Sequence, residues 1–292
     1  MRTFGPAVMK KITVLLLLII LVCSAGCTSL FFYPRQQLLD NPTAQKFSPE
    51  DIWFKASDGV NLHGWFFSGG PKATGTVLVL HGNAENLSTH VNSVLWLVQS
   101  GFNLFIFDYR GYGKSEGSPG IEGVHLDAEA ALETLLTMPR AGGKQIVVLG
   151  QSLGGAIAVY TTANSPYKDK IAALVIDSAF SSYRLIAREK LSQFYITWPL
   201  QYPLSFLVSD FYSPIRWIKK VSPVPLLIIH GEQDPVVLIH HGQMLYDEAL
   251  QPKNFWMSWV PGHVTSFSNE RVREELVRYL TMKLEKNMTD VT

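Results

Sequence analysis

Residues 146–154 read Ile-Val-Val-Leu-Gly-Gln-Ser-Leu-Gly, an apolar run followed by a serine set between two glycines. The run predicts a buried strand, and the small residues Gly155, Ala156 and Ala158 after it predict a closely packed helix. In a G-x-S-x-G turn between a strand and a helix, the serine hydroxyl stands clear of the sheet. An ordinary glycine-rich turn would read the same way, but the strand and helix on either side favour Ser152 as a nucleophile.

Similar apolar runs recur on both sides of this stretch and alternate with helical patterns. We expect strands at residues 52–56, 60–67, 76–80, 104–107, 146–149, 172–176, 226–229 and 255–260. We expect helices at residues 91–99, 124–137, 153–163, 240–249 and 269–284. Fully apolar strands separated by helices are typical of a mostly parallel central sheet flanked by helices on both faces. The sequence therefore predicts the α/β fold class.

Composition excludes several classes of protein. The chain has 292 residues, of which 47% are hydrophobic, so it can bury a large core and is not disordered. A formal net charge of +1 does not indicate a protein that binds nucleic acid. The two cysteines, Cys23 and Cys27, lie close together near the start and cannot form a disulfide framework. The sequence does not define an oligomeric state.

A nucleophilic serine needs a base, and the base needs an orienting acid. Asp234 follows the run at 226–229, and His263 follows the last predicted strand. Because the carboxyl ends of parallel strands share one edge of a sheet, Ser152, Asp234 and His263 can converge there. Asp177, after the run at 172–176, is an alternative acid. Asp234 is favoured over it because Gly-x-x-Asp ahead of the histidine is the commoner arrangement.

These motifs together resemble the α/β-hydrolase superfamily, within its single-domain serine-aminopeptidase-like group. The resemblance extends over about residues 50–285 and is carried by the segments 81–84, 108–115, 150–154, 231–234 and 262–263. It implies an α/β-hydrolase fold in which Ser152 is the nucleophile, His263 the base and Asp234 the acid. It also implies an oxyanion hole formed by the backbone N–H groups of Asn83 and Leu153.

The predicted hydrolase domain covers residues 49–287 and contains a short helical cap insert at about 181–221. The insert has nine aromatic residues among 41, and six basic residues against two acidic ones. Two interpretations stay open for this composition. The aromatic residues either form an apolar roof over an acyl pocket, with basic residues that favour anionic lipid surfaces, or they pack the cap onto the core.

The N-terminus carries a targeting pattern. Lys10 and Lys11 precede an apolar stretch at residues 12–22, and small residues at 24–26 lead into Cys27. The pattern resembles the lipobox of bacterial lipoproteins, whether the chain starts at Met1 or Met9. It implies a signal peptide at 1–26, a lipid on Cys27, a linker at 27–48 and a place in the bacterial cell envelope. Thr28 after the cysteine favours the outer membrane if the source is Gram-negative. An ordinary secretory signal and an uncleaved anchor are the alternatives.

The sequence thus predicts an envelope-tethered serine hydrolase that cleaves an ester or related acyl bond through an acyl-enzyme. Its substrate would be a small acyl compound, and a lipid is one candidate. The alternatives are a peptidase acting on short peptides and a non-catalytic protein with the hydrolase fold. No cofactor is expected. No metal is expected either, since H-E-x-x-H is absent and His240-His241 has no carboxylate in a helix-face pattern.

Overall fold

The computed structural model describes residues 32–141 and 146–289, so the expected signal peptide and Cys27 lie outside the described residues. An eight-stranded sheet forms the centre in the order β1-β2-β4-β3-β5-β6-β7-β8. The first two pairings in this order are antiparallel and the other five are parallel. The strands are β1 (Glu50–Lys55), β2 (Asn61–Phe67), β3 (Thr76–Leu80), β4 (Asn103–Asp108), β5 (Ile146–Gln151), β6 (Ile171–Asp177), β7 (Leu226–Gly231) and β8 (Lys253–Ser258).

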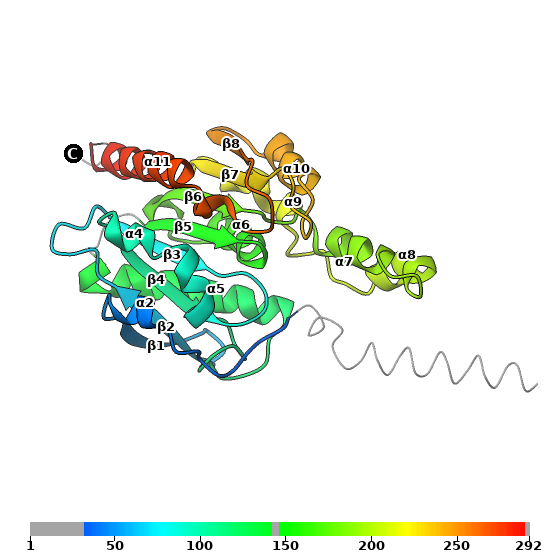
Figure 1. Cartoon of the computed structure of the whole chain (residues 1–292), viewed down its shortest axis with the longest axis horizontal. Coiled ribbons are helices and arrows are strands. Elements are labelled where there is room, and N and C mark those ends of the chain that lie inside the picture. The colour runs from blue at the N-terminus through cyan, green and yellow to red at the C-terminus, as the bar shows by residue number, and fades with distance from the viewer. Residues whose placement is uncertain (1–31, 142–145, 290–292) are drawn as a thin grey trace, which may run out of the picture.

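Helices cover both faces of the sheet (Figure 1). One face packs against α5 (Ile121–Thr137), α6 (Leu153–Asn164) and α10 (His240–Glu248). The other face packs against α2 (Pro42–Gln45), α3 (Leu87–His90), α4 (Trp96–Gln99) and α11 (Glu270–Thr289). The α/β fold expected from the sequence is confirmed.

The continuous apolar runs follow from this two-sided burial. Side chains alternate along a strand, so Leu78 and Leu80 of β3 enter one core while Val77 and Val79 enter the other. All four residues are fully buried. A strand covered on both faces has no position for a solvent-facing polar residue, which is why the central strands show no polar alternation.

The helix expected at residues 91–99 is interrupted. A 3₁₀ turn (Val91–Ser93) is followed by α4, and Val94 between them leaves the helical region with a φ of −128°. The Ser93 hydroxyl donates to Gln151 Oε1 of β5 and to the carbonyl of His90. The hydrogen bond to Gln151 holds the turn against β5. A contact of this kind cannot be recognised from the local sequence pattern.

The insert expected at 181–221 divides into two parts. Helices α7 (Tyr183–Ser192) and α8 (Gln201–Ser205) project from the body of the molecule (Figure 1). Helix α9 (Pro214–Trp217) returns to pack against α6. The returning part brings Tyr212 and Trp217 edge-to-face against Tyr160 of α6. Aromatic residues therefore pack the returning end of the insert onto the core, as does Tyr183 at the start of α7, whereas the aromatic residues from 194 to 206 are exposed.

The turn between β5 and α6 depends on glycine. A Cβ on Gly154 would lie 1.9 Å from the carbonyl oxygen of Leu80, and one on Gly150 would lie 2.4 Å from the carbonyl oxygen of Gly154. Backbone therefore approaches backbone at distances that exclude any side chain. Ser152 sits between these glycines at φ 54° and ψ −117°, a strained conformation for a residue with a side chain.

We expect Gly154→Ala to lower the free energy of unfolding by more than about 3 kcal/mol, because the rigid β3 backbone cannot move aside. The measurement is urea unfolding followed by tryptophan fluorescence. Gly70→Ala is the matched control, since Gly70 has a φ of 96° but nothing within 4 Å of its added Cβ. It should cost about 1 kcal/mol from backbone strain alone. Equal losses in the two variants would contradict the close approach of α6 to β3.

Candidate active site

The serine, histidine and aspartate predicted from the sequence come together at the carboxyl edge of the sheet. Ser152 follows β5, Asp234 follows β7 and His263 follows β8. The Ser152 Oγ lies 2.8 Å from His263 Nε2, and His263 Nδ1 lies 2.7 Å from Asp234 Oδ2. Both distances are those of hydrogen bonds. The three residues therefore form one hydrogen-bonded chain across segments that are up to 111 positions apart.

The surroundings of Asp234 keep its carboxylate ionised. Burial opposes ionisation and is the largest single effect, but the hydrogen bond and charge of His263 and the backbone N–H groups of Val236 and Val237 together outweigh it. The pKa of Asp234 is therefore lowered from its ordinary value. The other carboxylate oxygen accepts the N–H groups of Val236 and Val237 at 2.8 and 3.0 Å. An ionised carboxylate only accepts, so His263 Nδ1 carries a proton. Neutral His263 then presents a free lone pair on Nε2 to the Ser152 hydroxyl.

Asp177, the alternative acid, is the last residue of β6 and has no hydrogen bond to His263. Its carboxylate accepts from Ser178, Gln151 and Ser266 at 3.2, 3.3 and 2.9 Å, and its backbone carbonyl accepts the N–H of Ser152 at 2.8 Å. Complete burial without a cation raises the pKa of Asp177 to about 6, although these hydrogen bonds oppose the shift. Asp177 therefore supports the serine turn through the backbone.

The loop after β3 faces the serine. A Cβ built on Gly82 would lie 3.6 Å from the Cβ of Ser152, so this loop passes directly beside the nucleophile position. The side-chain oxygen of Asn83 accepts the N–H of Tyr33 at 3.0 Å, the hydroxyl of Tyr112 at 2.8 Å and the N–H of Ala84 at 2.8 Å. Three donors thus fix the conformation of the loop at Asn83.

Leu153 is the first residue of α6, and the first N–H groups of a helix have no partner within the helix. The N–H of Leu153 therefore points out of the start of α6, beside Ser152. The Asn83 loop also passes beside Ser152, and the use of the Asn83 and Leu153 N–H groups as an oxyanion hole stays a prediction.

His81 has a packing role. Its ring stacks on His90 with centroids 4.9 Å apart, and its carbonyl accepts the Tyr109 hydroxyl at 3.1 Å. Burial, together with the adjacent His81, lowers the pKa of His90 to about 4, so His90 is neutral at physiological pH. His90 stacks on His81 and contacts the carbonyl of Ala84 through Nε2 at 3.0 Å, so the two rings pack beside the Asn83 loop.

A pocket of about 450 Å³ opens beside Ser152. Its lining comes from core loops and helix starts, namely Gly82, Asn83, Glu85, Thr89, His90, Ser93, Gln151, Ser152, Val236, His263 and Val264. Residues 181–221 contribute nothing to this lining, so the insert does not roof the pocket. Glu85 is the carboxylate in the lining, and Arg35 Nε pairs with it at 3.1 Å. The pocket therefore has no uncompensated charge at Glu85.

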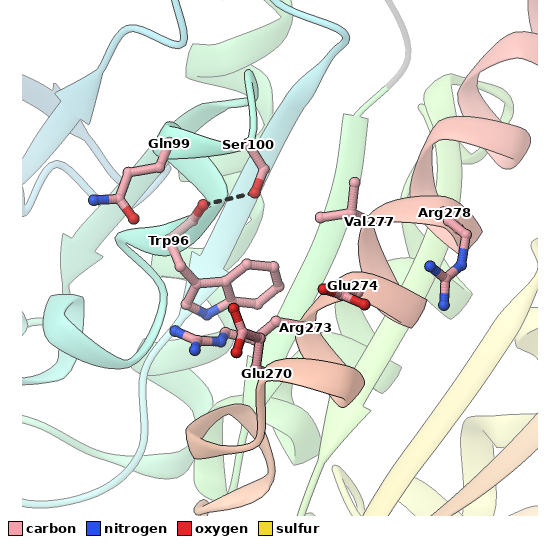
Figure 2. A pocket seen from close by; sticks show the side chains of 8 residues that line it. All are labelled: Trp96, Gln99, Ser100, Glu270, Arg273, Glu274, Val277 and Arg278. Atoms are coloured by element: carbon pink, nitrogen blue, oxygen red, sulfur yellow. Dashed lines mark hydrogen bonds between the residues drawn. The ribbon is translucent and has the colours of Figure 1, made fainter.

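A second cavity, of about 480 Å³, lies between α4 and α11, away from Ser152 (Figure 2). Its lining includes four charged residues of α11, namely Glu270, Arg273, Glu274 and Arg278, and Figure 2 shows Glu270 and Arg273 beside Trp96. The Ser100 hydroxyl donates to the carbonyl of Trp96, and the residues lining this cavity include no histidine. A serine without a base cannot be activated, so the cavity beside Ser152 is the candidate active site.

One group of three potential metal ligands occurs in the part of the chain that the structure describes. Glu189 of α7 lies 3.0 Å from the Nε2 atoms of both His240 and His241 of α10. The backbone N–H of Ser181 donates to His241 Nδ1 at 3.1 Å, and burial lowers the pKa of His241. The neutral ring therefore carries its proton on Nε2, where it donates to Glu189 and cannot bind a metal. The cluster fastens the insert to the core.

Sequence reasoning missed this cluster. Glu189 is about 50 positions from the two histidines, and only the tertiary fold brings α7 beside α10.

The order of the sheet and the position of the serine, acid and histidine after β5, β7 and β8 define an α/β hydrolase.

The chain belongs to the α/β-hydrolase superfamily. Residues 71–207 match the family described as serine aminopeptidase, S33. The Escherichia coli (strain K12) protein YfhR, described as uncharacterized, is 34% identical over 261 residues, which cover 87% of each chain. The Arabidopsis thaliana alpha/beta hydrolase domain-containing protein WAV2 is 37% identical over 206 residues, which cover 68% of this chain and 66% of WAV2.

Solved structures show the same fold. The Pyrococcus furiosus esterase Pf2001 matches with a TM-score of 0.67 at 22% identity, and the match covers 88% of this chain and 97% of the esterase. At this identity the likeness concerns the fold alone. The family and the fold together support a hydrolase.

The raised pKa of Asp177 predicts a pH effect on stability. An unfolded aspartate ionises near pH 4, whereas folded Asp177 keeps its proton up to about pH 6. Between these values the folded state binds more protons than the unfolded state, so the stability contributed by Asp177 falls as pH rises. We expect Asp177→Asn to gain about 2 kcal/mol in free energy of unfolding over wild type between pH 4.5 and 7.5.

Urea unfolding at the two pH values measures this gain. Glu232→Gln, which replaces an exposed carboxylate, supplies the baseline. A stability difference between Asp177→Asn and wild type that stays constant with pH would show that Asp177 titrates normally.

Proposed function

We propose that this protein is a serine hydrolase that cleaves an ester or related acyl bond through Ser152. The observation that carries the proposal is the hydrogen-bonded chain from Ser152 Oγ through His263 to Asp234, with distances of 2.8 and 2.7 Å. The strained backbone of Ser152 at the start of α6 supports it, because a retired site would not need to maintain this conformation. A non-catalytic protein with the hydrolase fold is the alternative.

The proposed reaction begins when Ser152 Oγ attacks the acyl carbon and passes its proton to His263 Nε2. The carbonyl oxygen becomes an oxyanion, which the N–H groups of Leu153 and Asn83 stabilise. His263 then gives the proton to the leaving alcohol, and the acyl group stays on Ser152. Water attacks the acyl-enzyme by the same route, with His263 again as base, and releases the acid. Asp234 stabilises the transient imidazolium in both steps.

The pocket favours an uncharged acyl substrate over a peptide amine. Binding the free amine of a peptide calls for an uncompensated carboxylate near the serine. Glu85 is the carboxylate in the pocket lining, and Arg35 neutralises it at 3.1 Å. An ester is therefore the first substrate class to test, and a short peptide is the alternative.

We also propose that the enzyme is tethered to the bacterial cell envelope by a lipid on Cys27, as the lipobox-like residues 24–27 suggest. Among the residues that the structure describes, no helix is long and apolar enough to cross a membrane. A lipid with two or more acyl chains holds a protein on a bilayer far more firmly than a single chain does.

Labelling with a fluorophosphonate and turnover of p-nitrophenyl esters test the reaction. We expect wild type to be labelled, and Ser152→Ala and His263→Ala to lose at least about 10⁴ in kcat/KM toward the esters. Asp234→Asn should lose about 10³–10⁴, because the wrong tautomer of His263 is favoured. Asp177→Asn is the matched control and should stay within about tenfold of wild type.

Three results would change the proposal. Unlabelled but folded wild type would favour the non-catalytic alternative. A large loss in Asp177→Asn with little loss in Asp234→Asn would move the acid to β6. Faster turnover of aminoacyl p-nitroanilides than of esters would favour the peptidase.

Cys27→Ser tests the anchor. In cells fed labelled palmitate, we expect wild type to take up label and to sediment with membranes. The serine variant should take up none, because serine lacks the thiol that would carry the lipid. Cys23→Ser is the matched control and should behave as wild type does. Unchanged labelling in Cys27→Ser would overturn the lipoprotein assignment.

A further inference from the structure

The projecting part of the insert exposes a dense set of large apolar side chains. We call residues 194–207 the tip; they run from the end of α7 through α8. Tyr195 is 95% exposed and Trp198 is 60% exposed. The other exposed apolar residues that matter here are Phe194, Ile196, Tyr202 and Phe206. A soluble surface does not normally gather so many large apolar residues, so this face is suited to a partner.

The charged side chains that lie against the rings of the tip are cations, and the nearest carboxylates in sequence, Glu189 and Asp210, are hydrogen-bonded at its base. No aspartate or glutamate occurs from residue 190 to residue 209. The guanidinium groups of Arg184 and Arg188 lie over the rings of Phe206 and Tyr202, at 5.1 and 5.3 Å from the ring centroids. Aromatic and aliphatic residues bordered by cations match the interface of a bilayer that contains anionic lipids. The tip itself contains no charged residue, so its rings can enter the apolar side of the bilayer interface while the two guanidinium groups at its border meet anionic headgroups.

The tip rests on a fixed base. The carboxylate of Asp210 accepts from the hydroxyl of Ser182 at 2.7 Å and from that of Ser213, so it joins the two ends of the projecting part. On the core side, Glu189 accepts from His240 and His241. The aromatic residues are therefore presented at a defined position and do not have to fold on binding.

The chain enters the structure at the same edge of the sheet. The N–H of Tyr33 donates to Asn83, and that of Arg35 donates to the carbonyl of Glu85, in the loop after β3. Helix α7 follows the carboxyl end of β6, which is separated from β3 by β5 in the sheet. Figure 1 shows the blue beginning of the described chain on the side from which α7 and α8 project.

Phe32 is five positions after Cys27, so at most about 18 Å separates the two residues. A lipid on Cys27 would therefore hold the active-site edge close to the bilayer, where the tip can reach it. This step rests on the proposed tether. The composition and exposure of the tip do not depend on it.

We propose that the tip docks on an anionic lipid surface, with Trp198 and its neighbours at the interface and Arg184 and Arg188 facing lipid headgroups. Docking adds a second contact to the lipid anchor and turns the edge that carries Ser152 toward the membrane. The pocket, which the insert leaves uncovered, is then open on the side where lipid-borne acyl groups are found.

Tryptophan quenching in vesicles tests the docking. The full chain is reconstituted in vesicles of phosphatidylcholine and phosphatidylglycerol, in which the phosphatidylcholine carries bromines near the headgroup end of its acyl chains. We expect wild type to lose a larger fraction of its fluorescence than Trp198→Phe does. Trp53→Phe is the matched control, because Trp53 on β1 is 56% exposed but far from the tip in sequence and fold. It should be quenched at least as strongly as wild type.

The charge requirement gives a second readout. The difference between wild type and Trp198→Phe should shrink when phosphatidylglycerol is replaced by phosphatidylcholine, or when Arg184 and Arg188 are both changed to Gln. Equal quenching of wild type and Trp198→Phe, with matching circular dichroism, would overturn the proposal. If wild type also self-associates in detergent and Trp198→Phe does not, the tip binds a second copy of the chain. Quenching does not depend on catalysis, and fluorophosphonate labelling does not depend on docking. A negative result for docking therefore does not count against the proposed hydrolase activity, or the reverse.

Discussion

The approach of α6 to the end of β3 is the constraint on which the rest of the site depends. Gly154 lies so near the Leu80 carbonyl that a single added carbon would overlap it. This contact pins the start of α6 over the carboxyl edge of the sheet and forces Ser152 into its strained backbone. The serine hydroxyl then stands within hydrogen-bonding distance of His263, and the first N–H of α6 lies beside it. A larger residue at position 154 would separate the helix from the sheet and the serine from its partners.

Two buried carboxylates near this turn illustrate how surroundings assign roles to identical groups. Asp234 has an imidazole and two backbone N–H groups around it, and its pKa is lowered. Asp177 has hydroxyl and amide donors but no cationic partner within hydrogen-bonding distance, and burial raises its pKa. The first is suited to stabilise a positive imidazolium. The second connects β6 to the serine turn through its backbone carbonyl.

The insert joins the two aspects of the proposed function. Its returning end packs Tyr212 and Trp217 against α6 and belongs to the core. Its projecting end leaves the pocket uncovered and presents Tyr195 and Trp198 outward. The same aromatic-rich composition therefore serves packing in one half and exposure in the other. Composition counts residue types but does not record which side of a helix faces the protein.

The sequence by itself determined the α/β class, most strand and helix positions and the serine and histidine that meet at the site, and it narrowed the acid to two aspartates. It could do so because burial on both faces imposes continuous apolar runs, and because G-x-S-x-G and the residues after strands are local patterns. Only the tertiary structure decided between Asp234 and Asp177 as the partner of His263, since both follow apolar strands. It alone brought Glu189 to His240 and His241 and showed which aromatic residues of the insert are exposed. These features depend on contacts between segments that are far apart in the chain. Such contacts produce no periodic pattern of residues in the sequence.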